Sequence, residues 1–396
     1  MNVDQALELL GGLSPARFMR RHWQKKPLLV RQAMPGFTPL LPRAELFALA
    51  AREGVESRLL RHGGGRWTLR RGPLPRRALP PLGQREWTLL VQGVDLHHDG
   101  VHALMQRFRF VPDARLDDVM ISYASDGGGV GPHTDRYDVF LLQAQGRRRW
   151  RIGRQKDPRL VEGLPLKILA HFEPEQEWVL EPGDMLYLPP GWAHDGVALG
   201  ECMTYSIGFR QPARGELARE LLQRLADEAG DALGDAPYRD PGQGATGAPG
   251  AVPEAMVDFT RAAVRQLAGD EDTLAMLLGE WLTEPKPDVW FDAAPDAGFD
   301  SARGLRLDRR TRMMYDAQHV FINGEGFRAS GRDAELMRRL ADERVLPAAQ
   351  WRRLSAPARE LLSEWLQAGW LHECAGPLPD ANPAARKRGG KSSEHD

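Results

Sequence analysis

The sequence predicts a mixed α and β protein, with an antiparallel β-sandwich or barrel, then a helical region, then a winged-helix-like module. Three observations predict it. Short apolar runs separated by Gly, Pro and Asp extend from about residue 87 to residue 209, as in antiparallel sheets. Apolar residues at helical spacing follow, up to residue 282. Beyond residue 283, helical patterns accompany one strand and a tight turn.

The N-terminal part, residues 1–94, is expected to be an α/β part that completes the central domain. Amphipathic patterns predict short helices at 16–23 and 43–52, between loops rich in Pro, Gly and Arg. This part carries 16 Lys and Arg against 6 Asp and Glu, whereas residues 213–300 carry 7 against 18. Either these are two solvated faces of one molecule, or the basic part lies near an RNA-rich partner. Charge alone leaves both interpretations open.

The central part, residues 95–212, holds most of the predicted strands. A turn is expected at 144–146, so that the runs on either side of it form two separate strands. The predicted strands are 119–123, 137–143, 147–152, 178–180, 185–188 and 203–209.

Three apolar stripes at helical spacing make up the helical region, residues 213–282. Such stripes commonly face an intramolecular core, but we predict that here they build a homodimer. The insert at 241–253, rich in Gly, Pro and Ala, is expected to be a loop. The stripes are Leu217, Leu221, Leu222 and Leu225; Met256, Phe259, Ala263, Val264 and Leu267; and Leu274, Leu277, Leu278 and Trp281.

The C-terminal part, residues 283–375, is predicted to be winged-helix-like. It combines a strand at 320–322, a turn at Asn323 and Gly324, and helices around 334–344 and 358–369. Arginines are frequent, but no run of them lies on one recognition helix, so we expect protein–protein packing and no direct nucleic-acid binding. The polar residues 376–396 are expected to form a disordered tail.

Composition excludes several classes of protein. No stretch approaches the roughly 18 apolar residues of a membrane span. The first residues, MNVDQALELLGG, lack the basic and apolar regions of a secretory signal. Cys202 and Cys374 are the two cysteines, which excludes a disulfide scaffold and a Cys-rich zinc module and fits the reducing cytoplasm.

Residues of metal-ligating types occur in two segments. His133 and Asp135 are two apart in GGGVGPHTDRYDVF, so on a strand both side chains project from one face. His194 ends EPGDMLYLPPGWAH, and we expect it to end a second strand. Two imidazoles and one carboxylate can occupy one face of an octahedral metal and leave three positions open, as in non-haem Fe(II) oxygenases. The sequence therefore predicts one iron site.

A buried cation is predicted beside this site, in RRRWRI at 147–152. Alternation places Arg148 on the same face as Trp150 and Ile152, whose large apolar side chains mark the inner face. An isolated buried guanidinium is costly and does not neutralise, so Arg148 needs an anion. A carboxylate ligand held bidentately is one partner, and an ion pair with a protein acid such as Asp138 is the alternative.

These motifs resemble a known family. The HTD motif with a distal His, the inward Arg and PGDMLYLPPGWAH are similar to the cupin-type, JmjC-containing Fe(II)/2-oxoglutarate oxygenases. GGGVGPHTDRYDVFLLQ, GRRRWRI and the segment 313–327 (MMYD to HVFINGEGF) resemble the bacterial ribosomal oxygenases, which hydroxylate an arginine of large-subunit ribosomal protein sixteen. The resemblance covers nearly the whole chain. It implies a double-stranded β-helix (cupin/JmjC jelly roll) core, a helical dimerisation region and a C-terminal winged-helix-like domain.

The resemblance also implies an activity and its residues. The protein is then an Fe(II)-dependent hydroxylase that uses 2-oxoglutarate and dioxygen as cosubstrates, acts on a ribosomal protein and forms a homodimer. His133, Asp135 and His194 match the catalytic iron ligands. Arg148 matches the residue that binds the far carboxylate of 2-oxoglutarate, and Ser122 matches a second contact to it.

Residues that contact the protein substrate are less defined. A peptide arginine needs acidic and aromatic walls, for which Tyr137, Asp138 and Tyr205 are candidates. Asp126, beside the glycine run at 127–131, is a further candidate, although an Asp before Gly commonly forms a turn. The glycines themselves are expected to let a substrate backbone approach the metal.

Other functions stay open at this point. The same chemistry could act on a histidine or another protein residue, or remove a methyl group from N-methyl-lysine. A non-catalytic cupin that binds the ribosome is a different class, but it would be expected to lack part of the ligand set. A cupin isomerase or quercetinase-like enzyme normally uses several histidines and has no use for an inward arginine.

Overall fold

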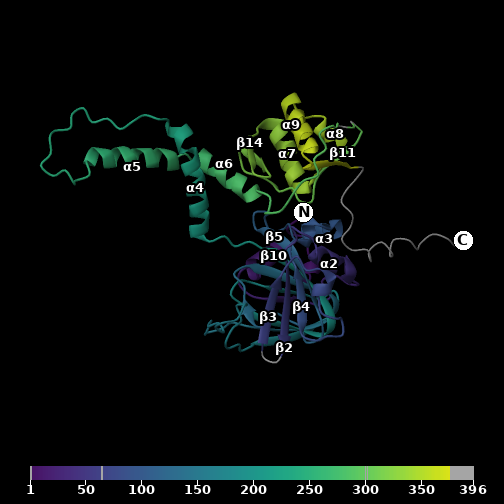
Figure 1. The fold of residues 1–396 in the computed structure, drawn as a ribbon. Coiled ribbons are helices and arrows are strands. Elements are labelled where there is room, and N and C mark those ends of the chain that lie inside the picture. The colour runs from purple at the N-terminus through teal and green to yellow at the C-terminus, as the bar shows by residue number, and fades with distance from the viewer. Residues whose placement is uncertain (1, 64–65, 299, 301, 375–396) are drawn as a thin grey trace. The chain divides into compact units, whose positions relative to one another are not determined.

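The computed structural model describes residues 2–63, 66–298, 300 and 302–374, and Figure 1 shows its fold. Contacts within the chain divide it into two compact units. The first ends at residue 211 and also includes 288–290, and the second contains 212–287 and the described chain from 291 onward. The predicted tail at 376–396 lies outside the described residues.

The first unit is built on one antiparallel sheet of ten strands, which fits the predicted barrel-type core. Its main path runs β1-β9-β7-β10-β5-β4-β2-β3, with β6 paired to β10 and β8 paired to β7. The strands β1 and β3 are therefore opposite edges of that path. The bounds are β1 (Leu28–Val30), β2 (Ser57–Gly63), β3 (Arg66–Arg71), β4 (Trp87–Val91), β5 (Leu116–Ala124), β6 (His133–Thr134), β7 (Asp138–Gly153), β8 (Gln176–Leu180), β9 (Met185–Leu188) and β10 (Ala193–Phe209).

The sheet separates two apolar clusters, because successive side chains of a strand point to opposite faces. The outer face packs Tyr123 and Phe140 against the N-terminal helices. The inner face carries Leu141, Trp150 and Ile152 in a second cluster. The helices of this unit are α1 (Pro15–Arg21), α2 (Arg43–Ala50) and α3 (Asp99–Gln106), with single 3-10 turns at η1 (Glu8–Leu10), η2 (Arg76–Ala78) and η3 (Val94–Leu96).

Helix α1 begins where the sequence supplies a cap. The Ser14 hydroxyl accepts a hydrogen bond from the Arg17 amide at 3.3 Å, and Pro15 occupies the first helical position. The predicted helices at 16–23 and 43–52 correspond to α1 and α2. The predicted Arg-rich loops around residues 57–71 are instead the hairpin of β2 and β3.

Two strands are longer than predicted. Strand β7 passes through 144–146 without the predicted turn, because Gly146 allows close approach: a Cβ there would lie 2.1 Å from the Glu201 carbonyl oxygen on β10. The β7–β10 register shifts next to this point, as at a β-bulge. Strand β10 begins at Ala193, so the expectation that His194 ends a strand is wrong: it lies at the start of β10.

The second unit begins with three helices and continues into a small α/β module. One buried cluster joins the two three-stranded sheets of that module, β15-β11-β16 and β12-β13-β14, to its helices. The predicted strand and turn are β13 and its connection to β14, where Asn323 and Gly324 both have positive φ, as in a type I′ hairpin. The elements are α4 (Arg214–Leu233), α5 (Glu254–Ala268), α6 (Glu271–Thr283), β11 (Gly304–Leu307), β12 (Met313–Tyr315), β13 (His319–Ile322), β14 (Glu325–Arg328), α7 (Gly331–Glu343), β15 (Val345–Leu346), α8 (Ala348–Trp351), α9 (Ala356–Gln367) and β16 (Leu371–Cys374).

The structure also bears on three simpler predictions. Residues 241–253 form neither helix nor strand, as expected for a loop. Cys202 and Cys374 are both free. None of the described helices is long and apolar enough to span a membrane.

Candidate metal centre

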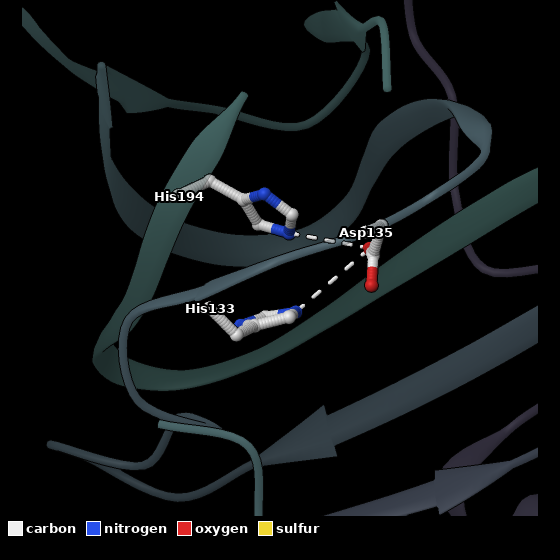
Figure 2. Close-up of side chains that lie close together, drawn as sticks. All are labelled: His133, Asp135 and His194. Atoms are coloured by element: carbon white, nitrogen blue, oxygen red, sulfur yellow. Dashed lines mark ion pairs between the residues drawn. The ribbon is translucent and has the colours of Figure 1, made fainter. Parts of the chain in front are cut away.

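The pairing of β6 with the start of β10 places His133 directly opposite His194. Asp135 follows two residues after His133, and Figure 2 shows the three side chains converging. The Asp135 Oδ2 atom lies 3.5 Å from His194 Nε2 and 3.9 Å from His133 Nε2. One ligand atom from each residue lies within 4.8 Å of the others, an arrangement that no other His, Cys, Asp and Glu residues of the described chain share.

Hydrogen bonds at the back of each imidazole fix which nitrogen faces the centre. His133 Nδ1 lies 2.8 Å from the Gly131 carbonyl oxygen, and His194 Nδ1 lies 3.1 Å from that of Trp192. A carbonyl only accepts, so each Nδ1 donates a hydrogen and each Nε2 is the nitrogen left available to a metal. Burial chiefly, and then the neighbouring His133, lower the pKa of His194 to about 4, so this imidazole is neutral near pH 7. Two imidazoles and one carboxylate fit a ferrous ion.

The glycine run serves the chain's own packing. A Cβ at Gly128 would lie 2.4 Å from the Trp87 carbonyl oxygen, and one at Gly129 would lie 2.6 Å from that of Gly196. Gly131 adopts φ +78° and lies against Trp67. The expectation that these glycines admit a substrate backbone is therefore not needed to explain them, since the loop must lie directly on neighbouring strands.

Arg148 projects inward, as alternation predicts, and is 5% exposed. Its Nη1 donates to the Ser122 hydroxyl at 3.2 Å, whereas Nε and Nη2 are buried without a hydrogen-bond partner. Asp138 is not its counter-ion, because the Asp138 carboxylate accepts from Tyr187 at 2.6 Å and pairs with Arg115. A buried guanidinium with two unpartnered nitrogens is costly, and its setting suits an anionic ligand.

A polar chain on the inner face extends from Arg148, and two of its members, Thr204 and Gln143, are not recognisable from the sequence. Ser122 on β5 is paired with Thr204 on β10, which is paired with Gln143 on β7. The Thr204 hydroxyl donates to Gln143 Oε1 at 3.0 Å. A Thr and a Gln from strands distant in sequence show no spacing pattern, so only the sheet register reveals them.

Trp150 lies close to both the candidate ligand His194 and the buried Arg148. Its ring centroid is 5.9 Å from that of His194, and the Arg148 Cζ atom is 5.7 Å from the Trp150 ring. The ring is seated against Gly196 of β10, where a Cβ would lie 2.6 Å from it. Gly196 therefore determines where this wall of the site lies.

Gly196→Ala is expected to push the Trp150 ring toward the space between His194 and Arg148. Overpacking of a filled core costs about 1–3 kcal/mol. We expect the apparent KM for 2-oxoglutarate to rise about ten-fold, as measured by succinate formation. Gly215→Ala is the matched control, since no heavy atom lies within 4 Å of its Cβ position. Adding Trp150→Phe to Gly196→Ala should restore part of the loss; an unchanged KM in Gly196→Ala would contradict this role.

The two substrate candidates lie in different settings. Asp126 accepts from the Gly200 amide at 2.8 Å and pairs with Arg85 at 2.9 Å, as the turn interpretation expects. A substrate role for Asp126 stays a prediction. Tyr137 is 40% exposed, and burial of its phenol, followed by the Asp135 carboxylate, raises its pKa. Tyr137 therefore lies beside the candidate ligand Asp135 and also contacts solvent.

The other two residues proposed to contact the substrate, Tyr205 and Asp138, face away from the site. Tyr205 is fully buried in the outer cluster, where its hydroxyl accepts from the Leu40 amide at 2.9 Å. Asp138 is fully buried with its partners Tyr187 and Arg115. A substrate role for Tyr137, like that for Asp126, stays a prediction.

Known proteins resemble this chain in both sequence and structure. A family model described as JmjC domain matches residues 103–217, and one described as ROXA-like winged helix matches residues 263–372. Ribosomal protein uL16 3-hydroxylase of Escherichia coli (strain K12) is 38% identical over 322 residues, which cover 78% of this chain and 84% of that relative. Ribosomal oxygenase 1 of Homo sapiens is 30% identical over 207 residues, covering 47% of this chain and 31% of that relative.

A solved structure shares the fold over most of its length. The structure of YcfD, a ribosomal oxygenase from Escherichia coli, in complex with cobalt and 2-oxoglutarate, matches with a TM-score of 0.74 and 32% identity. The match covers 91% of this chain and 97% of that one. The predicted combination of a cupin-type JmjC core and a winged-helix module is confirmed by these matches. From its similarity to a relative over most of both lengths, the chain belongs to the family of JmjC-domain ribosomal oxygenases.

Proposed function

We propose that the protein is an Fe(II)- and 2-oxoglutarate-dependent hydroxylase that modifies an arginine side chain of a large-subunit ribosomal protein in the cytoplasm. The observation that carries this proposal is the buried Arg148, with two unpartnered nitrogens, on the same sheet face as a convergent His, Asp and His. Three metal donors alone fit many metalloproteins. The same three donors together with the inward-facing Arg148 fit a molecule that chelates the metal and has a second, distant carboxylate.

Each residue then has a defined task. His133, Asp135 and His194 would hold Fe(II) through two Nε2 atoms and a carboxylate oxygen. Arg148 and Ser122 would bind the far carboxylate of 2-oxoglutarate and so orient the keto acid toward the metal. Iron, 2-oxoglutarate and dioxygen together supply the oxidation that puts one oxygen atom into a C–H bond, with release of succinate and carbon dioxide.

The substrate assignment has two supports. The Escherichia coli relative carries the name ribosomal protein uL16 3-hydroxylase. At the site itself, Tyr137 is partly exposed and lies beside the Asp135 carboxylate. An aromatic ring with neighbouring negative charge suits a guanidinium, through cation–π and charge-assisted contacts. A histidine or a methylated lysine remains the alternative target.

Mass spectrometry of treated ribosomal proteins tests the proposal. The full chain is incubated with Fe(II), 2-oxoglutarate, dioxygen and purified large-subunit proteins, with a parallel reaction that lacks 2-oxoglutarate. The proposal predicts that one arginine gains the mass of one oxygen atom, with succinate formed in equal amount. Oxygen gained on a histidine would make histidine the target, and loss of a methyl group would make N-methyl-lysine the target. No turnover by protein that still binds metal would favour the non-catalytic binding module.

We also propose that the chain forms a homodimer through α4 and α5. The apolar stripe of α5 has no buried residue within the described chain, and Phe259 and Val264 are 46% and 60% exposed. On α4, Leu222 is 61% exposed. Exposed apolar residues repeated at helical spacing favour association with a second amphipathic surface.

Charge on this stripe should therefore disrupt the dimer. The double substitution Phe259→Glu and Val264→Glu is expected to give a monomer by light scattering, whereas wild-type protein keeps a concentration-independent dimer mass. Arg265→Glu, at an exposed position on the same helix, is the control and should stay dimeric. Wild-type protein that is monomeric at every concentration would contradict the proposal.

A further inference from the structure

One stretch of the first unit carries positive charge alone. Residues 57–85 contain eight arginines and no Lys, Asp or Glu. The stretch forms the hairpin of β2 and β3 and the chain that follows it, at one edge of the main sheet. Single charges on an edge strand commonly prevent aggregation. Eight arginines without one acid exceed what that role requires.

Some of these arginines have partners inside the chain. Arg58 contacts Glu56 and Gln92, Arg85 pairs with Asp126, and Arg76 lies over the Phe47 ring. The other five are exposed and pair with no acid among the residues that the structure describes. These five are Arg61, Arg66, Arg70, Arg71 and Arg77.

The hairpin register gathers three of the five on one face. Arg66 and Arg70 alternate with Thr68 on β3, and Thr68 is paired with Arg61 on β2. Arg61 is thus the diagonal neighbour of Arg66 and of Arg70, a separation of roughly 7–8 Å that long side chains can span. Like charges so placed repel one another unless an anion lies between them. The three form what we call the arginine face: Arg61, Arg66 and Arg70.

The opposite face of the hairpin borders the loop that contains Gly131 and leads to His133. Trp67 stacks on His62 with ring centroids 4.3 Å apart. A Cβ on Gly131 would lie 3.1 Å from the Trp67 ring, and the Gly131 carbonyl is the group that holds His133. An anion bound on the arginine face would therefore be separated from the loop before His133 only by the β2–β3 hairpin.

We propose that the arginine face binds the phosphate backbone of RNA. Guanidinium groups hold phosphate oxygens bidentately, and positively charged surfaces without base-reading side chains bind RNA without sequence preference. The choice of RNA over an acidic protein rests on the proposed function, because a ribosomal protein occurs together with ribosomal RNA. This departs from the expectation of no direct nucleic-acid contact, which came from the C-terminal part.

Fluorescence anisotropy with a labelled single-stranded RNA of about 20 nucleotides tests the proposal. The full chain is titrated without metal or 2-oxoglutarate, so the result does not depend on hydroxylase activity. The variant carries Arg61→Gln, Arg66→Gln and Arg70→Gln. The control carries Arg17→Gln, Arg20→Gln and Arg21→Gln, three exposed positions on or near α1, whose Phe18 packs against Phe140 and Tyr187 of β7 and β9.

The outcomes are distinct. Each lost phosphate contact on a single strand lowers the salt slope by about 0.7. The variant should bind RNA at least about ten-fold more weakly at low salt, with a slope shallower by about 2; the control should match wild type. Equal binding by wild type and variant would overturn the proposal. So would displacement of the RNA by poly-glutamate at equal charge concentration, which favours an acidic protein partner, or aggregation of the variant with RNA binding retained, which favours edge protection.

Discussion

Asp135→Ala is expected to abolish hydroxylation and to weaken Fe(II) binding by more than about 100-fold. In the proposed centre Asp135 would supply the single negative donor, with Oδ2 at 3.5 Å and 3.9 Å from the two Nε2 atoms. Loss of even an outer hydrogen-bond partner of a metal ligand costs about 10–100-fold in affinity, so loss of a ligand costs more. Anaerobic titration with Fe(II) measures binding, and succinate formation measures turnover.

Thr134→Ala is the matched control for that experiment. Thr134 lies between the two ligands on the chain and is exposed. It should bind Fe(II) and turn over like wild type. Full metal affinity in Asp135→Ala would show that the metal binds elsewhere.

Arg148→Met is expected to raise the apparent KM for 2-oxoglutarate by about 30-fold or more. Truncating one partner of a buried, hydrogen-bonded charge pair costs about 2–5 kcal/mol. Arg148→Lys keeps the charge but loses the planar fork and should fall between Met and wild type. Arg147→Met, at an exposed neighbouring position, is the control and should leave the KM unchanged.

The same substitution separates a ligand-binding role from a structural one. Without 2-oxoglutarate, Arg148 is a buried charge with two unpartnered nitrogens. Replacing it by an apolar side chain of similar length should leave the Tm unchanged or raise it. Added 2-oxoglutarate with a redox-inert metal should raise the Tm of wild type and not that of Arg148→Met beyond the metal's own effect. A marked drop in Tm with an unchanged KM would contradict the assignment.

Periodicity was sufficient to predict the features that are local in sequence. The inward direction of Arg148 follows from its alternation with Trp150 and Ile152, and the structure buries all three. The hairpin at Asn323 and Gly324 follows from residues that tolerate positive φ. The three helical stripes correspond to α4, α5 and α6 because apolar spacing near 3.6 residues has no other common explanation.

Features that depend on register could not be predicted. The start of β10 is rich in small and polar residues, so residues 193–202 show no strand alternation, and the sequence predicts a strand end at His194 where a strand in fact begins. In the sequence Gly146 is typical of a turn, but in the structure it lets the backbone of β7 lie close to that of β10 beside a bulge. The β2–β3 hairpin was missed because its arginines mask the alternation, and the contact of Trp67 with Gly131 joins distant segments.

An anaerobic crystal structure with Mn(II) and 2-oxoglutarate tests the central claim most directly. The account predicts one metal ion bound by Nε2 of His133, Nε2 of His194 and a carboxylate oxygen of Asp135, chelated by the keto acid. It also predicts that the far carboxylate of 2-oxoglutarate lies on the Nε and Nη2 groups of Arg148 that lack partners. A metal held by other residues, or a 2-oxoglutarate whose far carboxylate lies away from Arg148, would contradict it.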